Sequence, residues 1–207
     1  VLAAAVPVSA GLWRAGGRRL AGLGLALCLV GFAHAGWVAL APCLSCRDGP
    51  ADVTVYQKNL RFDGTDRAAL VADIIASGAD LITLQEVSRA SLVVLSDLDA
   101  AYPYRHLCPF SGVGGIAILS RLPLTAPECP VPGLATARVA LAAGDFVVAS
   151  VHLYWPFPFD QHGQVERIRA ALGDPARLIL GGDFNMQPWG WAVRGLPGDR
   201  IGGLGVT

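Results

Sequence analysis

Four polar residues that could take part in catalysis stand at or near the ends of apolar segments. They are Asn59 in VYQKN, Glu86 in LITLQE, His152 in VVASVH and Asp183 in LILGGD. A hard divalent cation prefers carboxylate and amide oxygens as ligands, and Asn59, Glu86 and Asp183 supply these groups. A carboxylate in a segment as apolar as LITLQEV costs free energy unless it is solvated, paired or bound to a metal. These residue types therefore predict a site for a hard divalent cation.

Each residue also has an ordinary structural explanation when it is taken alone. Asn59 could open a turn, and Glu86 could lie in the first turn of a following helix, where the helix dipole favours an acid. His152 alone fits a buried histidine. Gly181-Gly182-Asp183 fits a turn in which Asn185 is a local cap. The functional interpretation therefore depends on whether the chain brings these side chains together.

The segments before these residues predict strands that could do so. Alternating or continuous apolar patterns predict strands over 52–58, 80–85, 145–151 and 177–181. Further strands are expected over 114–120 and 134–142, and helices over 66–77, 88–101, 161–172 and 189–194. Strand ends that meet at one rim of a sheet hold side chains on a rigid support. Because hairpins are mixed with strand–helix–strand units, we expect an α/β fold of the α+β type with mixed sheets.

A long apolar run near the N-terminus predicts a membrane segment. Residues 20–41 contain no charged side chain, and about 20 apolar residues in a helix span a bilayer core. We therefore predict a transmembrane helix over residues 20–42. A cleaved signal peptide ending near Ala33-His34-Ala35 and a buried core helix are the alternatives.

This helix would divide the chain into four parts. A short apolar and basic segment (1–19) precedes it, a linker (43–51) follows it, and the remaining residues (52–207) form one domain. Arg14, Arg18 and Arg19 lie just before the apolar run. The positive-inside rule then places the domain outside the cytoplasm. Earlier spans upstream of Val1 are compatible with this topology.

The overall composition excludes several classes of protein. Of the 207 residues, 53% are hydrophobic and 15% are charged, and the mean hydropathy is +0.48. These values exclude a disordered chain and a coiled coil. Sixteen basic residues balance 16 acidic residues, so no overall positive field would attract nucleic acid.

The five cysteines leave two interpretations open. Cys28 lies in the apolar run, Cys43 and Cys46 form a C-x-x-C, and Cys108 and Cys129 lie in the domain. The second C-x-x-C or histidine pair of a zinc site is absent, and no βαβ pattern surrounds the motif. Two disulfides, Cys43–Cys46 and Cys108–Cys129, would fit an oxidising compartment. Free buried thiols fit the sequence equally well.

Five segments, taken in order, resemble the endonuclease/exonuclease/phosphatase superfamily. They are VYQKNLRF around Asn59, DLITLQEV around Glu86, GGIAILSRLPL around Arg121, VVASVHL around His152, and LILGGDFNMQP around Asp183 and Asn185. The resemblance implies a four-layer sandwich of two mixed β-sheets flanked by helices. The apolar N-terminal part is similar to that of bacterial members that are anchored in the cell membrane. Such members carry the catalytic domain on the extracytoplasmic side.

The resemblance also implies metal-dependent hydrolysis of a phosphoester, with a diester expected. Glu86 would bind Mg²⁺ or Mn²⁺ with Asn59 beside it, and Asp183 would orient and deprotonate the attacking water. Asn185 would donate a hydrogen bond to the phosphoryl group, and His152 would help to position that group. Arg61 and Arg121 are expected to add a local anion site. A cation and a fixed amide donor both stabilise charge that develops on the phosphoryl oxygens.

The sequence departs from the family pattern near its end. The family pattern ends with an Asp-His pair, and none of the four histidines (34, 106, 152 and 162) directly follows an aspartate. We therefore expect the chain to be a fragment that lacks the last strands. We expect the 207-residue fragment to bind metal poorly and to be inactive. The alternative is a membrane-anchored binding or scaffold domain that has kept the fold and lost the chemistry.

The sequence thus predicts a membrane-tethered, metal-dependent phosphoester hydrolase of the nuclease or phosphatase type. Its substrate could be a nucleic acid, a phospholipid headgroup or a small phosphate ester. The loop Tyr154–Phe159 carries four aromatic residues. This loop could contact lipid headgroups, stack on bases or pack over the sheet edge. No protein partner is predicted.

Overall fold

The computed structural model describes residues 13–14, 17–44, 52–64, 66–142, 144–187 and 190–198, without the side chains of 38–44. The chain divides into two compact units. One unit consists of residues 1–49 with 199–207, and the other consists of residues 50–198. Each unit is described by itself below.

The first unit contains one long apolar helix, α2 (Arg18–Leu44). Its stretch Arg18–Trp37 is 20 residues long, has a mean hydropathy of 1.7, and is long and apolar enough to cross a membrane. Signal sequences and the core helices of soluble proteins can meet the same criteria, although only 11% of this stretch is buried. The predicted helix over residues 20–42 lies within α2. Most of the predicted linker 43–51 lies outside the described residues.

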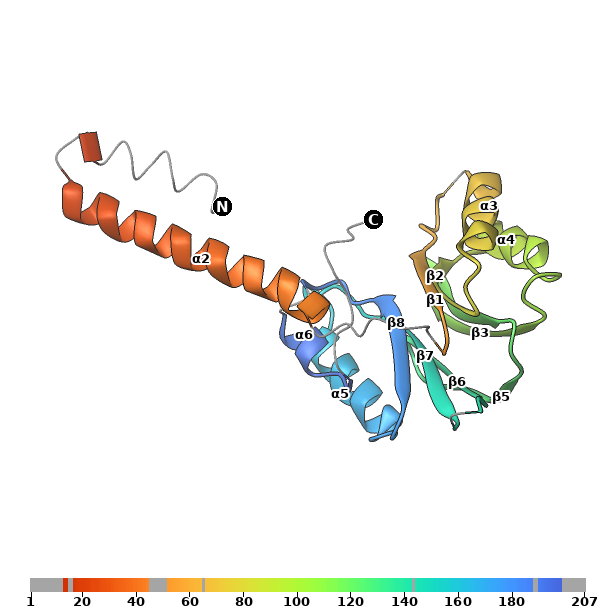
Figure 1. The fold of residues 1–207 in the computed structure, drawn as a ribbon. Helices are drawn as coiled ribbons and strands as arrows, with labels where there is room; N and C mark the ends of the chain where they lie inside the picture. Colours follow the sequence, from red (N-terminus) through yellow and green to blue (C-terminus); the bar gives the residue numbers. More distant parts are fainter. Residues whose placement is uncertain are drawn as a thin grey trace. The chain divides into compact units, whose positions relative to one another are not determined.

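The second unit begins with a mixed four-stranded sheet in the order β1-β2-β4-β3 (Figure 1). Strands β1 and β2 are parallel and are joined through helix α3, whereas β4 is antiparallel to both β2 and β3. The elements of this half are β1 (Val55–Asn59), α3 (Arg67–Ser77), β2 (Leu81–Val87), η1 (Arg89–Ser91), α4 (Leu92–Asp97), β3 (Tyr104–Ser111) and β4 (Gly114–Ser120).

A second mixed sheet follows, in the order β5-β6-β7-β8. Strands β5, β6 and β7 form antiparallel pairs, and β7 pairs in parallel with β8 after the crossover through α5. The elements of this half are β5 (Leu124–Val131), β6 (Leu134–Val139), β7 (Phe146–His152), α5 (Gln161–Leu172), β8 (Leu178–Asp183) and α6 (Trp191–Arg194). Each sheet therefore contains one βαβ unit with a parallel strand pair.

Three layers of apolar side chains hold the two sheets and their helices together. Ile74 of α3 and Leu95 of α4 pack with Leu84 on one face of the first sheet. Ile118 and Val148 belong to the cluster between the two sheets. Residues of α5 and α6 pack with Val151 on the other face of the second sheet. The predicted four-layer sandwich of two mixed sheets flanked by helices is confirmed (Figure 1).

The crossover helices begin at aspartates that cap them. The side chain of Asp66 accepts a hydrogen bond from Ala69 N at the start of α3, and Gly78 ends this helix with φ 64°. Asp160 accepts from Gly163 N at the start of α5, and this backbone hydrogen bond lowers the pKa of Asp160. Side-chain acceptors of this kind satisfy amide groups that have no partner within the helix. The caps thus fix where each crossover leaves the rim of its sheet.

The structure adds two strands to the predicted elements and corrects one predicted helix. Strands β3 and β5 were not predicted, because β3 (YRHLCPFS) and β5 (LTAPECPV) have no clear alternation and are largely exposed edge strands. The predicted helix over 88–101 is in fact the short turn η1 followed by α4, which ends at Asp97. Ser88 makes no side-chain cap hydrogen bond there.

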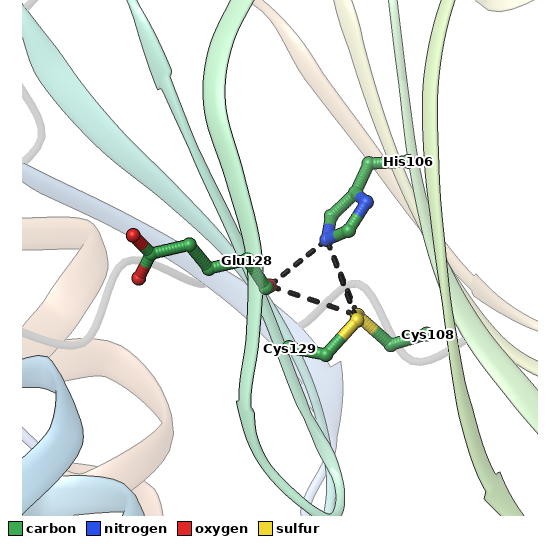
Figure 2. Close-up of a disulfide and its surroundings, with 4 residues drawn as sticks. All are labelled: His106, Cys108, Glu128 and Cys129. Atoms are coloured by element: carbon green, nitrogen blue, oxygen red, sulfur yellow. Dashed lines mark hydrogen bonds between the residues drawn. A yellow bond between two sulfur atoms is a disulfide. The ribbon is translucent and has the colours of Figure 1, made fainter.

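A disulfide between Cys108 of β3 and Cys129 of β5 joins the two sheets (Figure 2). His106 lies beside it, with Nε2 3.2 Å from the Sγ of Cys108 and 2.9 Å from the carbonyl oxygen of Glu128. Of the two pairings considered from sequence, Cys108–Cys129 is therefore present in the structure. The pairing Cys43–Cys46 lies outside the described residues, and Cys28 is a free, buried cysteine.

Candidate active site

Four of the sequence-predicted site residues lie together where two parallel strand pairs end. Asn59 is the last residue of β1 and pairs with Gln85 of β2, so Glu86 lies one residue beyond that pair. His152 ends β7 and pairs with Asp183, which ends β8. Ligand atoms of Glu86, His152 and Asp183 all lie within 4.8 Å of one another. The carboxyl ends of the two βαβ units thus meet at one cluster.

Asn59 connects the two carboxylates across the sheets. Its Nδ2 donates a hydrogen bond to Glu86 Oε1 at 2.9 Å and a second one to Asp183 Oδ2 at 2.7 Å. Its Oδ1 accepts from the amide of Arg61 at 2.8 Å. An amide nitrogen has two hydrogens, so one side chain can hold both acids.

The backbone at the cluster adopts conformations that L-residues rarely populate. Glu86 has φ 56°, Arg61 has φ 53° and Asn185 has φ 45°. Glu86 lies where the pairing between β2 and β4 shifts, between Leu84 and Val87. Its Oε2 also accepts from the amide of Phe62 at 2.9 Å. Strained backbone of this kind is concentrated at functional sites, where the surrounding structure holds the side chain in place.

His152 is 4% exposed, and its Nδ1 has no hydrogen-bond partner among the residues that the structure describes. Burial lowers the pKa of His152, although the carboxylates of Asp183 and Glu86 act in the opposite direction. The ring is therefore favoured in its neutral form, which keeps one nitrogen able to accept. A buried nitrogen without a partner costs free energy unless a ligand or water occupies that position.

A chain of polar side chains, buried at Gln85 and Ser150, connects the two sheets near the cluster. Gln57 donates to Gln85 at 2.7 Å, and Gln85 donates to Ser150 of β7 at 3.0 Å. The hydroxyl of Ser150 in turn donates to the carbonyl oxygen of Leu84 at 3.3 Å. Our sequence analysis did not identify this chain. The sequence feature that could have indicated this chain is Gln85, an uncharged polar residue in the largely apolar strand LITLQEV.

The donor set fits a hard divalent cation. Glu86 and Asp183 present two carboxylates to one point and share one neutral amide. Within the part of the chain that the structure describes, neither acid forms an ion pair. Two like charges this close repel each other, and a cation bound at Glu86 would reduce that repulsion.

Asn185 lies at the cluster, and its side-chain amide already donates one hydrogen bond to a backbone carbonyl. Its amide N–H donates to Asp183 Oδ1 at 2.9 Å, and its Nδ2 donates to the carbonyl oxygen of Leu153 at 2.7 Å. One hydrogen of the side-chain amide remains available, since the –NH₂ group carries two. Asn185 therefore orients Asp183 and keeps one donor for a bound group.

The structure places the two predicted arginines differently. Arg61 contributes its backbone to the cluster, while its guanidinium is 78% exposed and pairs with Asp63 at 3.4 Å. Arg121 is not brought to the site. It follows β4, whose last residue pairs with the first residue of β2, at the end opposite to Glu86. Its Nη1 donates to the carbonyl oxygen of Gly78 and its guanidinium lies over Tyr102.

Phe110 lies beside the cluster and was missed because β3 was not predicted. Its ring lies 5.0 Å from the ring of His152 and 5.1 Å from the ring of Tyr154. Phe110 also lines a cavity of about 650 Å³ between the segment after Glu86 and the β3–β4 hairpin. The lining is mainly apolar and includes Leu92 and Leu107. The candidate site therefore has an apolar wall on one side.

The four-layer sandwich and its cluster of two acids, an amide and a histidine are compatible with metal-dependent hydrolysis of a phosphoester. The model of the Endonuclease/Exonuclease/phosphatase family matches residues 57–203, which is more than half of the chain. The chain therefore belongs to the endonuclease/exonuclease/phosphatase family. No curated protein matches the chain.

Solved structures with the same fold are distant in sequence. A beta toxin mutant from Staphylococcus aureus with bound magnesium ions has a TM-score of 0.56 at 15% identity, covering 70% of this chain and 69% of that chain. Sphingomyelinase C from Streptomyces griseocarneus has a TM-score of 0.52 at 18% identity, covering 71% and 68%. D. rerio TDP2 in complex with a single-strand DNA product has a TM-score of 0.56 at 17% identity, covering 65% and 61%. These similarities establish the fold.

Proposed function

We propose that this protein is a membrane-tethered, metal-dependent phosphodiester hydrolase whose active centre is the cluster of Asn59, Glu86, His152 and Asp183. The observation that carries the proposal is the convergence of the two acids and His152 within 4.8 Å, from both sheets. Family membership supports the reaction class. The solved relative with bound magnesium and the relative with a DNA product support a divalent cation and a phosphodiester substrate.

In this proposal Glu86 holds Mg²⁺ or Mn²⁺, with Asn59 keeping its carboxylate in place. When bound, the metal supplies charge withdrawal from a non-bridging phosphoryl oxygen. Mg²⁺ is commonly held by one or two carboxylates together with waters and substrate phosphate, so a single glutamate is sufficient.

The other residues act on the water and on the phosphoryl group. Asp183 orients the attacking water and accepts its proton. Its carboxylate is held in place because Asn59 donates to Oδ2 and the backbone amide of Asn185 donates to Oδ1. The free hydrogen of the Asn185 amide donates to the phosphoryl oxygen where negative charge increases. His152, beside the two acids, helps to position the phosphoryl group.

The test is hydrolysis of bis-p-nitrophenyl phosphate by the full-length protein, with p-nitrophenyl phosphate as the monoester comparison. We expect turnover with Mg²⁺ or Mn²⁺ that stops on addition of EDTA. Asp183→Asn should lower kcat by about 100-fold or more, since general-base catalysis contributes roughly 10²–10⁴-fold. Glu86→Gln should lower turnover and raise the metal concentration needed for half-maximal rate.

The matched controls are Glu166→Gln and Asp63→Asn, which change acids that lie in exposed ion pairs outside the cluster. Both controls should keep the rate of the unmodified protein. Metal-independent hydrolysis that survives Glu86→Gln would contradict the proposal. So would a full-length protein that folds and binds Mg²⁺ but is inactive, and this result would favour a binding or scaffold domain.

A further inference from the structure

The loop after β7 exposes large aromatic side chains next to the candidate active centre. Trp155 is 62% exposed, Phe157 86% and Phe159 55%. The segment from Leu153 to Phe159 contains no charged residue. Exposed apolar side chains gathered on one loop indicate a contact surface rather than a packed one.

This loop is continuous with the wall of the catalytic cluster through a row of rings. Phe159 lies 6.0 Å from Tyr154, Tyr154 lies 5.1 Å from Phe110, and Phe110 lies 5.0 Å from His152, measured between ring centroids. Phe110 also borders the apolar cavity, where Leu92 and Leu107 are each more than 40% exposed. We call the surface formed by Leu92, Leu107, Phe110, Tyr154, Trp155, Phe157 and Phe159 the apolar strip.

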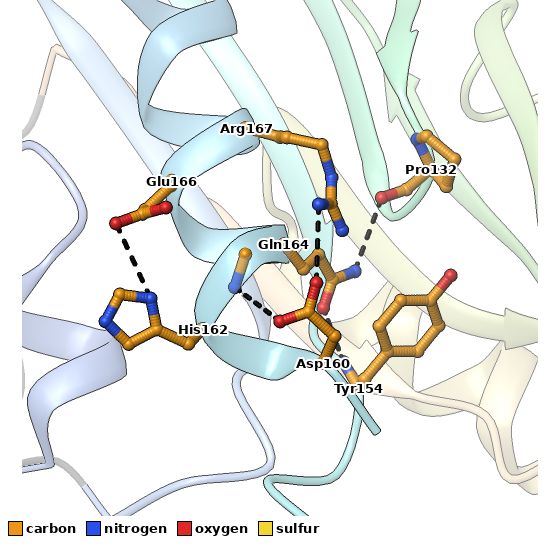
Figure 3. Close-up of polar contacts among 8 residues, drawn as sticks. Pro132, Tyr154, Asp160, His162, Gln164, Glu166 and Arg167 are labelled. Atoms are coloured by element: carbon orange, nitrogen blue, oxygen red, sulfur yellow. Dashed lines mark hydrogen bonds and ion pairs between the residues drawn. The ribbon is translucent and has the colours of Figure 1, made fainter.

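The base of the loop is held firmly, so its exposed tip is a feature of the fold. Gln164 of α5 accepts from the amide of Tyr154 at 2.7 Å, and donates to the carbonyl oxygens of His152 and Pro132 at 3.1 and 3.3 Å (Figure 3). Gln161 donates to the carbonyl oxygens of Tyr154 and Phe184. Asp160 caps α5 immediately after the loop (Figure 3). Both glutamines are 1% exposed.

Charge and composition favour a lipid surface over a nucleic acid as the occupant of the strip. The seven residues of the strip are uncharged and only Arg89 among the lining residues of the adjoining cavity carries a charge, whereas binding to a polyanion depends on several Lys and Arg contacts. From residue 50 onward the chain carries 12 basic and 15 acidic residues, so its overall charge does not attract phosphate backbones. Tryptophan and other aromatic side chains partition to the membrane–water interface. Helix α2, which is apolar enough to cross a bilayer, precedes this unit in the same chain.

We propose that the apolar strip docks on a lipid surface and that the substrate is an amphiphilic phosphodiester, with its phosphate at the catalytic cluster and its apolar part along the strip. This substrate class rests on the proposed hydrolase function. The docking itself depends only on the strip. Docking removes Trp155 and Phe157 from water and holds the cluster at the depth of lipid phosphates.

The first experiment measures docking without any need for catalysis. The full chain is reconstituted into phosphatidylcholine nanodiscs, with and without brominated acyl chains, which quench nearby tryptophan fluorescence. The unmodified protein is compared with Trp155→Phe and with the matched control Trp191→Phe. Trp191 is 37% exposed, stacks on His162 of α5 and does not belong to the strip. Trp37 lies in α2 and should be quenched in every variant, so we expect an additional quenched component that is lost in Trp155→Phe and persists in Trp191→Phe.

The second experiment measures the substrate class. Hydrolysis of phosphatidylcholine in the same membranes is divided by hydrolysis of bis-p-nitrophenyl phosphate. This ratio should fall about tenfold or more in Trp155→Ser/Phe157→Ser, because the variant loses the apolar area that drives docking. The control Tyr104→Ser removes a 40%-exposed aromatic residue from β3 and should leave the ratio unchanged.

Each outcome distinguishes the two proposals. Absence of a Trp155-dependent quenched component overturns the docking, whatever the protein hydrolyses. Quenching without hydrolysis of either diester leaves the docking in place and contradicts the proposed function. If quenching is present and the ratio is unchanged in the double variant, the amphiphilic substrate is excluded. A Trp155 emission change caused by a single-stranded oligonucleotide, in place of lipid quenching, would assign the strip to nucleic acid and overturn the proposal.

Discussion

At the scale of single residues, Asn59 determines how the two acids of the cluster are arranged. A neutral amide holds Glu86 and Asp183 together without cancelling their charge. The protein therefore keeps electrostatic repulsion at the site that a cation can relieve. A lysine in the position of Asn59 would hold the acids equally well but would compete with the metal.

This arrangement predicts a change in the effect of metal on stability. Mg²⁺ should raise the midpoint of thermal unfolding of the unmodified protein, because a ligand at about 100 times its Kd adds about 2.7 kcal/mol. In Glu86→Gln the metal-free protein should be as stable or more stable, since one of two like charges is gone, and the increment due to Mg²⁺ should disappear. Thermal unfolding with EDTA and with Mg²⁺ measures both effects.

The exposed variant Glu166→Gln provides the comparison, and it should keep the full increment. An equal increment in Glu86→Gln would show that Mg²⁺ binds elsewhere on the protein.

The positions of the site residues followed from sequence, whereas their contacts did not. Asn59, Glu86, His152 and Asp183 could be predicted because each ends a run of apolar or β-branched residues, and such runs form buried strands. Asn59 donates to both acids, and one of them, Asp183, lies 124 positions away in the sequence. No local sequence pattern can predict a contact over that separation. The strained φ of Glu86 likewise arises from the irregular pairing of β2 with β4.

At the scale of elements, the close approach of β8 to β2 depends on a residue without a side chain. A Cβ at Gly181 would lie 2.4 Å from Thr83 Oγ1 and 3.4 Å from Thr83 Cβ. Gly181 and Thr83 belong to different sheets, so this contact sets the separation of the sheets close to the cluster. The hydroxyl of Thr83 is buried and has no hydrogen-bond partner among the described residues. Its removal therefore breaks no hydrogen bond that the structure describes.

Gly181→Ala should destabilise the protein by about 1–3 kcal/mol, the usual cost of overpacking. Thr83→Ala removes the clashing oxygen, so the double variant Thr83→Ala/Gly181→Ala should recover part of that loss. Chemical denaturation of the two single variants and the double variant measures the coupling free energy. Additive losses would mean that the strain lies in the backbone around Gly181 instead of in the contact with Thr83.

The edge strands show the limit of sequence patterns at this scale. β3 and β5 are paired on one side only and contain Pro109, Pro127 and Pro130, so neither apolar alternation nor strand propensity marks them. The disulfide between Cys108 and Cys129 joins these two strands. Because β3 was not predicted, Phe110 was not predicted as a site residue either, although it lies on β3 and borders the cluster.

At the scale of the whole molecule, the two sheets contribute equally to the site. Each supplies one parallel pair, β1 with β2 and β7 with β8, and each pair ends in residues of the cluster. Each sheet alone would carry an incomplete set of groups. The polar chain from Gln57 through Gln85 to Ser150 keeps the two halves in register.

The tether proposed for this domain can be tested by its topology. Helix α2 is long and apolar enough to span a membrane, and Arg14, Arg18 and Arg19 lie before or at its start. If the positive-inside rule holds, an alkaline phosphatase reporter fused after Pro50 should be active, because this reporter folds only outside the cytoplasm. An N-terminal epitope tag on the same fusion should remain in the membrane fraction after alkaline extraction. Loss of the tag together with an active reporter would identify α2 as a cleaved signal peptide. An inactive reporter would place the domain inside the cell. That result would exclude a catalytic cluster that faces extracytoplasmic lipid.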